Sequence, residues 1–197
     1  MSMLETAFGR PRAGEYDPYY ERYISLVPGN DVLAALTALE DQRRQMVPLL
    51  SGRTKADGDL RYAPEKWSLK EVLGHVNDSE RILSYRALRI SRGDATPIEG
   101  FEQDDYVRNG PFARRTLADL IEDYIAVRRA TVSLFRNLDQ AAWTRRGVAN
   151  KNEVTVRALA YIIAATNCII GEFWKRNICA DSVLSSQFSV LSDRARY

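Results

Sequence analysis

Apolar side chains recur every three or four residues in four separate stretches of the chain, and this spacing places them on one face of an α-helix. The first stretch follows Asn30-Asp31, which offers an N-cap, and it predicts a helix over about 31–50. In the second, Ser68 and Glu71 form a capping box, so we expect a helix that starts there and ends at Gly93-Asp94. The apolar positions are Val32, Leu36, Leu39, Met46 and Leu50 in the first stretch and Leu69, Val72, Val76, Leu83, Ala87 and Ile90 in the second.

The third and fourth stretches complete an all-α pattern. Thr116 and Asp119 cap a third helix, whose apolar stripe continues at regular spacing to Leu138. A polar turn over 147–153 separates it from a fourth helix, which we expect from about Thr155 to Ile178. This last helix is apolar on nearly every side, which predicts burial against several helices and, in a homodimer, against a second copy of the chain.

The other segments define the expected domain organisation. We expect 1–29 to be an extended N-terminal segment packed on the bundle, 30–178 to be the bundle, and 179–197 to be a C-terminal tail. The connection between helices two and three, about 20 residues long, predicts a crossover or a pocket wall. No β-strand pattern is strong enough to change the class. The sequence therefore predicts an up-down four-helix bundle with a long connection between helices two and three.

Charge gives no reason to expect nucleic acid or a membrane as a partner, because 28 Lys and Arg nearly cancel 26 Asp and Glu. The arginine doublets at 43–44, 114–115, 128–129 and 145–146 each lie near acidic residues, so we expect them on solvated helix faces. The most apolar segment, 158–170, is shorter than the roughly 20 residues that span a bilayer. No signal peptide is evident, and Cys168 and Cys179 suit a reducing compartment, so we expect a cytoplasmic protein.

Few residues carry recognisable chemistry. The sequence has no phosphate-binding loop, dinucleotide fingerprint or nucleophile elbow. An acidic cluster at 102–105 lacks the alternating oxygen ligands of a calcium loop, which indicates a solvated turn, and Cys168 is expected in the core. His75 is the single histidine of the chain and lies on a half-apolar face of the second helix, where a lone histidine is more often structural than a ligand or a base.

Several motifs, in order and at matching spacing, resemble the DinB-like superfamily. These are KWS, LGHV, DxER, YRALR and RGD within 62–94, together with the stretches 15–28, 100–107 and 146–161. The resemblance implies an up-down four-helix bundle, often dimeric, in a family that includes bacillithiol-dependent transferases and mycothiol-dependent maleylpyruvate isomerase. It also implies a metal site with one histidine from the LGHV segment and two more, four residues apart, on helix four.

This chain departs from that pattern at the metal site. His75 matches the first family histidine, but Thr166 and Ile170 stand where the other two are expected. Isoleucine has no lone pair to offer a metal, so the resemblance implies a degenerate triad. We expect neither zinc nor nickel as a cofactor, although a site rebuilt from His75 with Asp78, Glu80 or Glu172 is a second possibility.

Three functional hypotheses follow. The first is a bundle that has lost the family metal and binds a small molecule in a pocket at the former site, formed by His75, Thr166 and Ile170. The second is a transferase or hydrolase that uses the same pocket, either with a rebuilt metal site or with His75 as a general base. The third is a structural or regulatory partner that acts through a helix interface. A role in DNA damage has no support in the residues.

Overall fold

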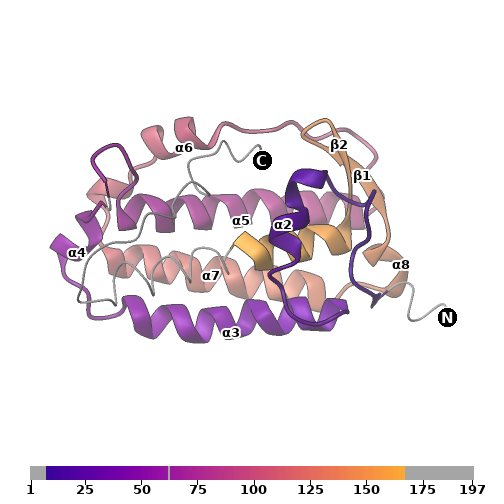
Figure 1. Ribbon diagram of the computed structural model, residues 1–197, viewed down its shortest axis with the longest axis horizontal. Helices are drawn as coiled ribbons and strands as arrows, with labels where there is room; N and C mark the ends of the chain where they lie inside the picture. The colour runs from indigo at the N-terminus through magenta and orange to yellow at the C-terminus, as the bar shows by residue number, and fades with distance from the viewer. Residues whose placement is uncertain (1–7, 62, 167–197) are drawn as a thin grey trace.

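The computed structural model describes residues 8–61 and 63–166 of this chain, and four helices of this part form the bundle (Figure 1). Each capping residue that the sequence predicts lies at the start of its helix: the Asp31 side chain accepts from the Ala34 N–H, and both Ser68 and Thr116 form complete capping boxes. The predicted starts of these three helices are therefore confirmed, and with them the prediction of a helical bundle. The bundle helices are α3 (Val32–Leu50), α5 (Leu69–Ser91), α7 (Leu117–Arg136) and a helix over 156–166.

The core has two apolar clusters, one at each end of the bundle. We call them the hairpin-end core, which includes Leu36, Leu83 and Phe135, and the far-end core, which includes Leu50, Leu73 and Leu120. Helix α3 runs from the hairpin-end core to the far-end core, whereas α5 and α7 both run in the opposite direction (Figure 1). Because α5 and α7 are parallel, the long connection between them must return along the bundle, so it is a crossover.

Short elements occupy segments that the sequence analysis assigned to loops. The expected extended N-terminal segment contains a 3-10 turn, η1 (Pro18–Tyr20), and the helix α2 (Glu21–Ile24). These residues are helical because Asp17 accepts from the Tyr19 N–H and Pro18 at the first position favours a helical start. The other short elements are α4 (Lys55–Asp59), α6 (Gln103–Asn109), η2 (Phe112–Arg114) and α8 (Gln140–Trp143).

The polar turn predicted over 147–153 is the end of a β-hairpin. Strand β1 (Arg146–Ala149) pairs antiparallel with β2 (Asn152–Thr155), and Ile98 of the crossover extends it through a bridge to Ala149. The two turn residues, Asn150 and Lys151, have φ values of 49° and 67°, as a tight two-residue hairpin turn requires. The sequence analysis missed this hairpin because its strands are short and the turn lacks the usual glycine.

A buried polar layer separates the two clusters, and it corrects the assignment of Arg128 to a solvated face. The Arg128 guanidinium donates to both carboxylate oxygens of Glu80 on α5, with Nη2 2.7 Å from Oε2, and Nη1 donates to the Leu39 carbonyl of α3 at 2.8 Å. Gln42 accepts from Arg128 Nη1 and donates to the carbonyl of Ala164. Arg128 faces inward because it shares the apolar stripe of α7 with Tyr124 and Thr131, and its side chain is 1% exposed.

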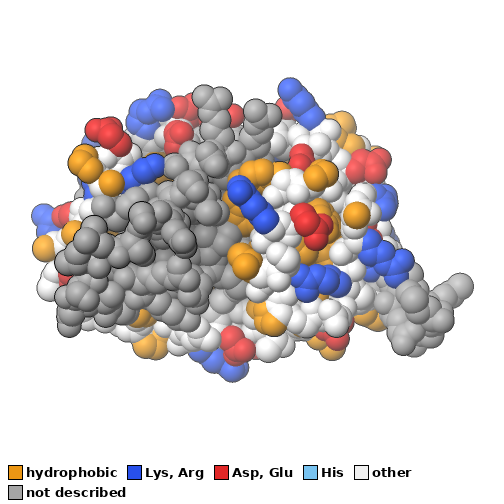
Figure 2. All heavy atoms as spheres, viewed as in Figure 1, with side chains coloured by type: hydrophobic (Ala, Val, Ile, Leu, Met, Phe, Trp, Pro, Cys, Tyr) orange, Lys and Arg blue, Asp and Glu red, His pale blue; other side chains and the backbone are white. Residues whose placement is uncertain are grey.

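The described surface carries charges of both signs. On the face drawn in Figure 2, lysine and arginine side chains are interspersed with aspartate and glutamate. Some ion pairs of the described residues lie within one helix turn, such as Arg108–Asp105 and Arg81–Asp78. None of the described helices is long and apolar enough to cross a membrane.

Candidate functional site

His75 lies near the start of α5, inside the far-end core. Its side chain is buried, and its ring stands against the Trp67 ring with centroids 4.9 Å apart. The Ser79 hydroxyl, one turn further along α5, is 3.4 Å from each ring nitrogen, so it is close to the ring without a short hydrogen bond. The preceding residue, Gly74, allows the Phe112 ring to lie directly on the helix, because a Cβ there would come within 2.2 Å of that ring.

Burial determines the charge of His75. Removing the ring from water disfavours the imidazolium form and lowers the pKa of His75 to about 4. At neutral pH the ring is therefore uncharged and keeps one nitrogen lone pair. A neutral imidazole can bind a metal, but a base of such low proton affinity is a weak general base near pH 7.

Two carboxylates that follow His75 on α5, Glu80 and Asp78, do not complete a metal site. Glu80 accepts from Arg128 through both of its oxygens, and this bonding would have to break before Glu80 could bind a cation. Asp78 pairs with Arg81, and burial raises the pKa of its carboxyl group. Within 8–61 and 63–166 no group of three His, Cys, Asp or Glu residues could hold a metal ion. The donor set of this part of the chain does not fit the metal that the family resemblance implies.

The structure places two of the three predicted site residues. Thr166 is buried, and its hydroxyl donates to the Ile162 carbonyl at 2.9 Å. Thr166 follows Ala164 by two residues, and the Ala164 carbonyl accepts from Gln42 of the polar layer. Within the described part of the chain, Thr166 and His75 share no hydrogen bond. Ile170, Cys168, Glu172, Cys179 and the predicted tail lie outside the described residues.

A cleft opens at the far end of the bundle, between α4 and the start of α7. This cleft of about 500 Å³ is lined by several basic residues, among them Arg53, Lys55, Lys70 and Arg115. Two of its cations already have carboxylate partners, because Lys70 contacts Asp59 at 2.5 Å and Arg115 contacts Asp123 at 2.5 Å. The cleft is therefore less electropositive than its lining suggests.

Sequence reasoning missed two buried arginines of α5 and α7, Arg86 and Arg128. Both lie within an apolar stripe of their helix. Arg86, for example, stands three residues after Leu83 and four before Ile90. A charged residue at such a position is buried when the helix packs on several sides, and Arg86 is 3% exposed. The acidic cluster at 102–105, in contrast, lies as expected, because Glu102, Asp104 and Asp105 are exposed around the first turn of α6.

Comparison with known proteins identifies the fold. The model of the DinB superfamily matches residues 38–165. YfiT from Bacillus subtilis, described as "a probable metal-dependent hydrolase with an unusual four-helix bundle topology", aligns with a TM-score of 0.63 at 14% identity, over 89% of this chain and 98% of that one. The mycothiol-dependent maleylpyruvate isomerase aligns with a TM-score of 0.62 at 13% identity, over 76% of this chain and 61% of that one. No curated protein matches the sequence. At these identities the two alignments show a shared fold alone.

Proposed function

This chain belongs to the DinB superfamily, whose model covers more than half of it, and on that premise we propose that it is a small-molecule-binding bundle that works without the family metal. The observation that carries the proposal is the donor set. The chain has one histidine, and Glu80, one of the carboxylates considered for a rebuilt site, is held on both oxygens by Arg128. A tight transition-metal site needs three or four such ligands.

The proposal assigns the former metal site to His75, Thr166 and Ile170. A threonine whose hydroxyl donates to its own helix, as Thr166 does to Ile162, is a poor metal ligand. Its methyl group and the neutral ring of His75 instead offer a mixed apolar and polar wall, which suits an uncharged part of an organic ligand. The fold also occurs in the protein described as a mycothiol-dependent maleylpyruvate isomerase, which is consistent with such a use of the fold.

The direct test is elemental analysis of protein purified without a metal-binding tag. We expect far less than one equivalent of zinc or nickel per chain, because one histidine alone binds these metals weakly. About one equivalent of a transition metal per chain would overturn the proposal and would favour a site rebuilt around His75.

A second test restores the family ligands. If Thr166 and Ile170 face His75, the double substitution Thr166→His and Ile170→His creates a three-histidine site, and zinc or nickel raises the melting temperature of that variant. Without metal the variant is less stable than the wild type by on the order of 2 kcal/mol, because Ile170→His removes apolar area. Adding His75→Ala should abolish the metal-dependent rise. A rise that survives His75→Ala, or no rise in a folded double variant, contradicts the assignment of these positions.

The alternative function is a transferase or hydrolase in which His75 acts as a base. The neutral ring of His75 favours it, while the low pKa of that ring limits the rate near neutral pH. Turnover of a thiol or ester substrate that disappears with His75→Ala, while the variant stays folded, would establish this alternative.

A homodimer is a separate proposal, which rests on the apolar character of the fourth helix. The described part of that helix, 156–166, is buried on all sides within a single chain, so it supplies no free face for a partner. The dimer therefore depends on residues beyond Thr166. Light scattering at micromolar concentration should give the dimer mass, and the monomer mass would contradict the proposal.

A further inference from the structure

Within residues 8–61 and 63–166, four cationic side chains are buried: Lys70, Arg86, Arg128 and Arg157. Three of them have a carboxylate partner. Lys70 pairs with Asp59, Arg128 with Glu80, and Arg157 with Glu15, whose carboxylate also accepts from Thr155. This pattern follows the general rule that a buried charge is retained when an opposite charge compensates for the loss of water.

Arg86 is the exception among these four. No carboxylate of the described residues lies within ion-pair distance of its guanidinium, and its single hydrogen bond runs from Nη2 to the Glu99 carbonyl, at 2.9 Å. Its Nε atom is buried and has no hydrogen-bond partner. Burial lowers the pKa of Arg86 and the nearby Tyr20 phenol raises it, but a guanidinium stays charged at any physiological pH. Within residues 8–61 and 63–166, this permanent charge is therefore buried without a carboxylate partner.

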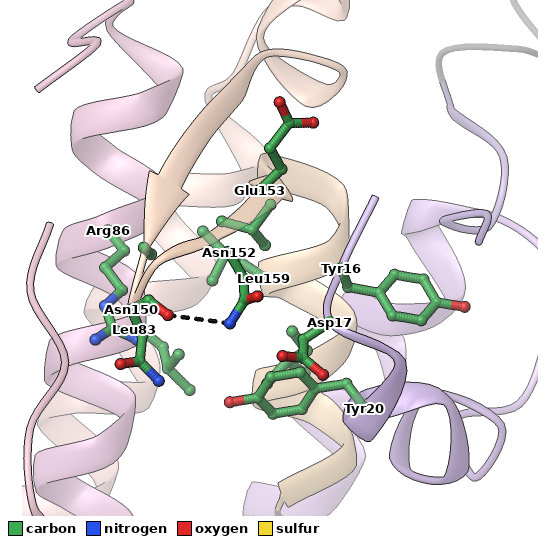
Figure 3. Close-up of a pocket in the computed structure, with 12 residues that line it drawn as sticks. Tyr16, Asp17, Tyr20, Leu83, Arg86, Asn150, Asn152, Glu153 and Leu159 are labelled. Carbon is green, nitrogen blue, oxygen red and sulfur yellow. Dashed lines mark hydrogen bonds between the residues drawn. The ribbon is translucent and has the colours of Figure 1, made fainter. Parts of the chain in front are cut away.

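Arg86 lines a cavity at the hairpin end of the bundle (Figure 3). The polar residues of its wall come from the N-terminal segment, which gives Asp17 and Tyr20, and from the turn of the hairpin, which gives Asn150 and Asn152. The Asn152 amide donates to the Asn150 carbonyl, which fixes that turn over the cavity (Figure 3). The apolar part of the wall consists of Leu83, Ala149, Val154, Leu159 and Ile162.

We propose that this cavity binds the carboxylate group of a small organic acid, with the Arg86 guanidinium as its partner. The planar guanidinium presents N–H donors at a spacing that matches the two oxygens of a carboxylate, and its Nε–H is one unused member of such a pair. The apolar wall suits an organic body attached to the carboxylate. The site lies eleven residues beyond His75 on the same helix, roughly 16 Å along its axis at 1.5 Å per residue, so the proposal does not depend on the function assigned to His75.

The size and charge of the cavity select the ligand class. The cavity is small, with a volume of about 30 Å³, and it is partly open, so a small anionic group can enter it while the ligand body stays toward the open side. A phosphate group is bulkier and carries more negative charge, which Asp17 in the same wall disfavours. Glu153 also lines the cavity, but its carboxylate points away from Arg86 in Figure 3 and pairs with Arg146.

The test is a titration of the full chain with benzoate and acetate, compared with benzamide, phosphate and chloride at equal ionic strength. Calorimetry should show saturable binding of benzoate, weaker binding of acetate, and no binding of benzamide, which has the same shape without the charge. In nitrogen-15 spectra of the wild type, one arginine Nε–H signal should move in proportion to the benzoate bound. Benzoate should also raise the melting temperature.

Matched variants locate the binding. Arg86→Met removes the guanidinium and keeps an apolar stem, and it should weaken benzoate binding at least tenfold. Arg92→Met removes an exposed arginine at the same end of α5 and should bind benzoate as the wild type does. Should Arg86→Met fail to fold, Arg86→Lys keeps the charge but loses the paired donors, and it should also weaken binding at least tenfold.

Three results would overturn the proposal. One is the absence of saturable benzoate or acetate binding by the wild type. Another is a loss smaller than tenfold in a folded variant of Arg86. The third is a tighter response to phosphate or chloride than to benzoate, which would assign the cavity to inorganic anions. None of these results bears on the metal content or on His75, so the proposed function is tested separately.

Discussion

Arg128 and Arg86 lie on adjacent helices and are both almost completely buried, but their guanidinium groups have very different partners. Around Arg128 four helices contribute: α5 gives the Glu80 carboxylate, α3 gives Gln42 and the Leu39 carbonyl, and the helix 156–166 is tied in through Gln42. Around Arg86 the described residues give one carbonyl, that of Glu99, and a cavity. The first arginine is a closed structural element, and the second is open toward a space that another molecule can enter.

The difference shows how buried charges that stabilise the fold can be distinguished from buried charges that bind a ligand. A compensated ion pair between helices contributes geometry, since removing one partner leaves the other charge stranded in the core. An uncompensated charge beside a cavity costs stability in the free protein and recovers it when an anion binds. The two cases therefore respond in opposite ways to the loss of a single group.

The largest effect is expected for Glu80→Gln. The substitution preserves shape but leaves the Arg128 guanidinium without a counter-charge, so the free energy of unfolding should fall by about 3–5 kcal/mol, measured by urea denaturation. The control Asp105→Asn breaks the exposed Arg108–Asp105 pair and should change stability by no more than about 0.5 kcal/mol. A loss below about 1 kcal/mol for Glu80→Gln would mean that the polar layer does not hold the helices as described.

His75 extends the comparison to a buried side chain that can lose its proton and become neutral, which arginine does not do at physiological pH. Its pKa is about 4 in the folded protein and near 6.5 in the unfolded chain, so the unfolded chain binds the proton more readily. The stability present above pH 6.5 is therefore lost as the pH falls toward 4, by up to about 3 kcal/mol. The difference between unfolding profiles of the wild type and His75→Gln isolates this term. Parallel profiles from pH 7 to 4.5 would show that His75 is accessible to protons in the folded state.

The smallest effect is expected for Arg86→Met in buffer free of carboxylates. Removing an uncompensated charge relieves its desolvation, while the hydrogen bond to the Glu99 carbonyl is lost, so the net change in unfolding free energy should stay within about 1 kcal/mol. Arg128→Met, which strands Glu80, should cost several times more under the same conditions. A loss above about 2 kcal/mol for Arg86→Met would place Arg86 with the structural arginines and remove the contrast.

Elements with strong local signals could be predicted from the amino-acid sequence. Ser68 with Glu71 and Thr116 with Asp119 announce helix starts because each pair satisfies backbone groups within one turn, and the structure has both caps. The apolar spacing similarly indicated the stripes of α3, α5 and α7, and the order of motifs indicated the superfamily, which the family model confirms. The length of the segment between α5 and α7 predicted a crossover or a pocket wall, and the parallel directions of the two helices identify it as a crossover.

Which charged side chains are buried in the bundle depends on packing between segments that are distant in sequence. Arg128 and Arg129 are neighbours with the same chemistry, yet a turn of about 100° between them puts the first against Glu80 and leaves the second exposed. The strands of the hairpin over 146–155 are short and have weak local patterns, so the sequence did not reveal them. The Arg86 cavity likewise arises where α5, the hairpin and the N-terminal segment meet, and residues that far apart in sequence are brought together by the packed fold.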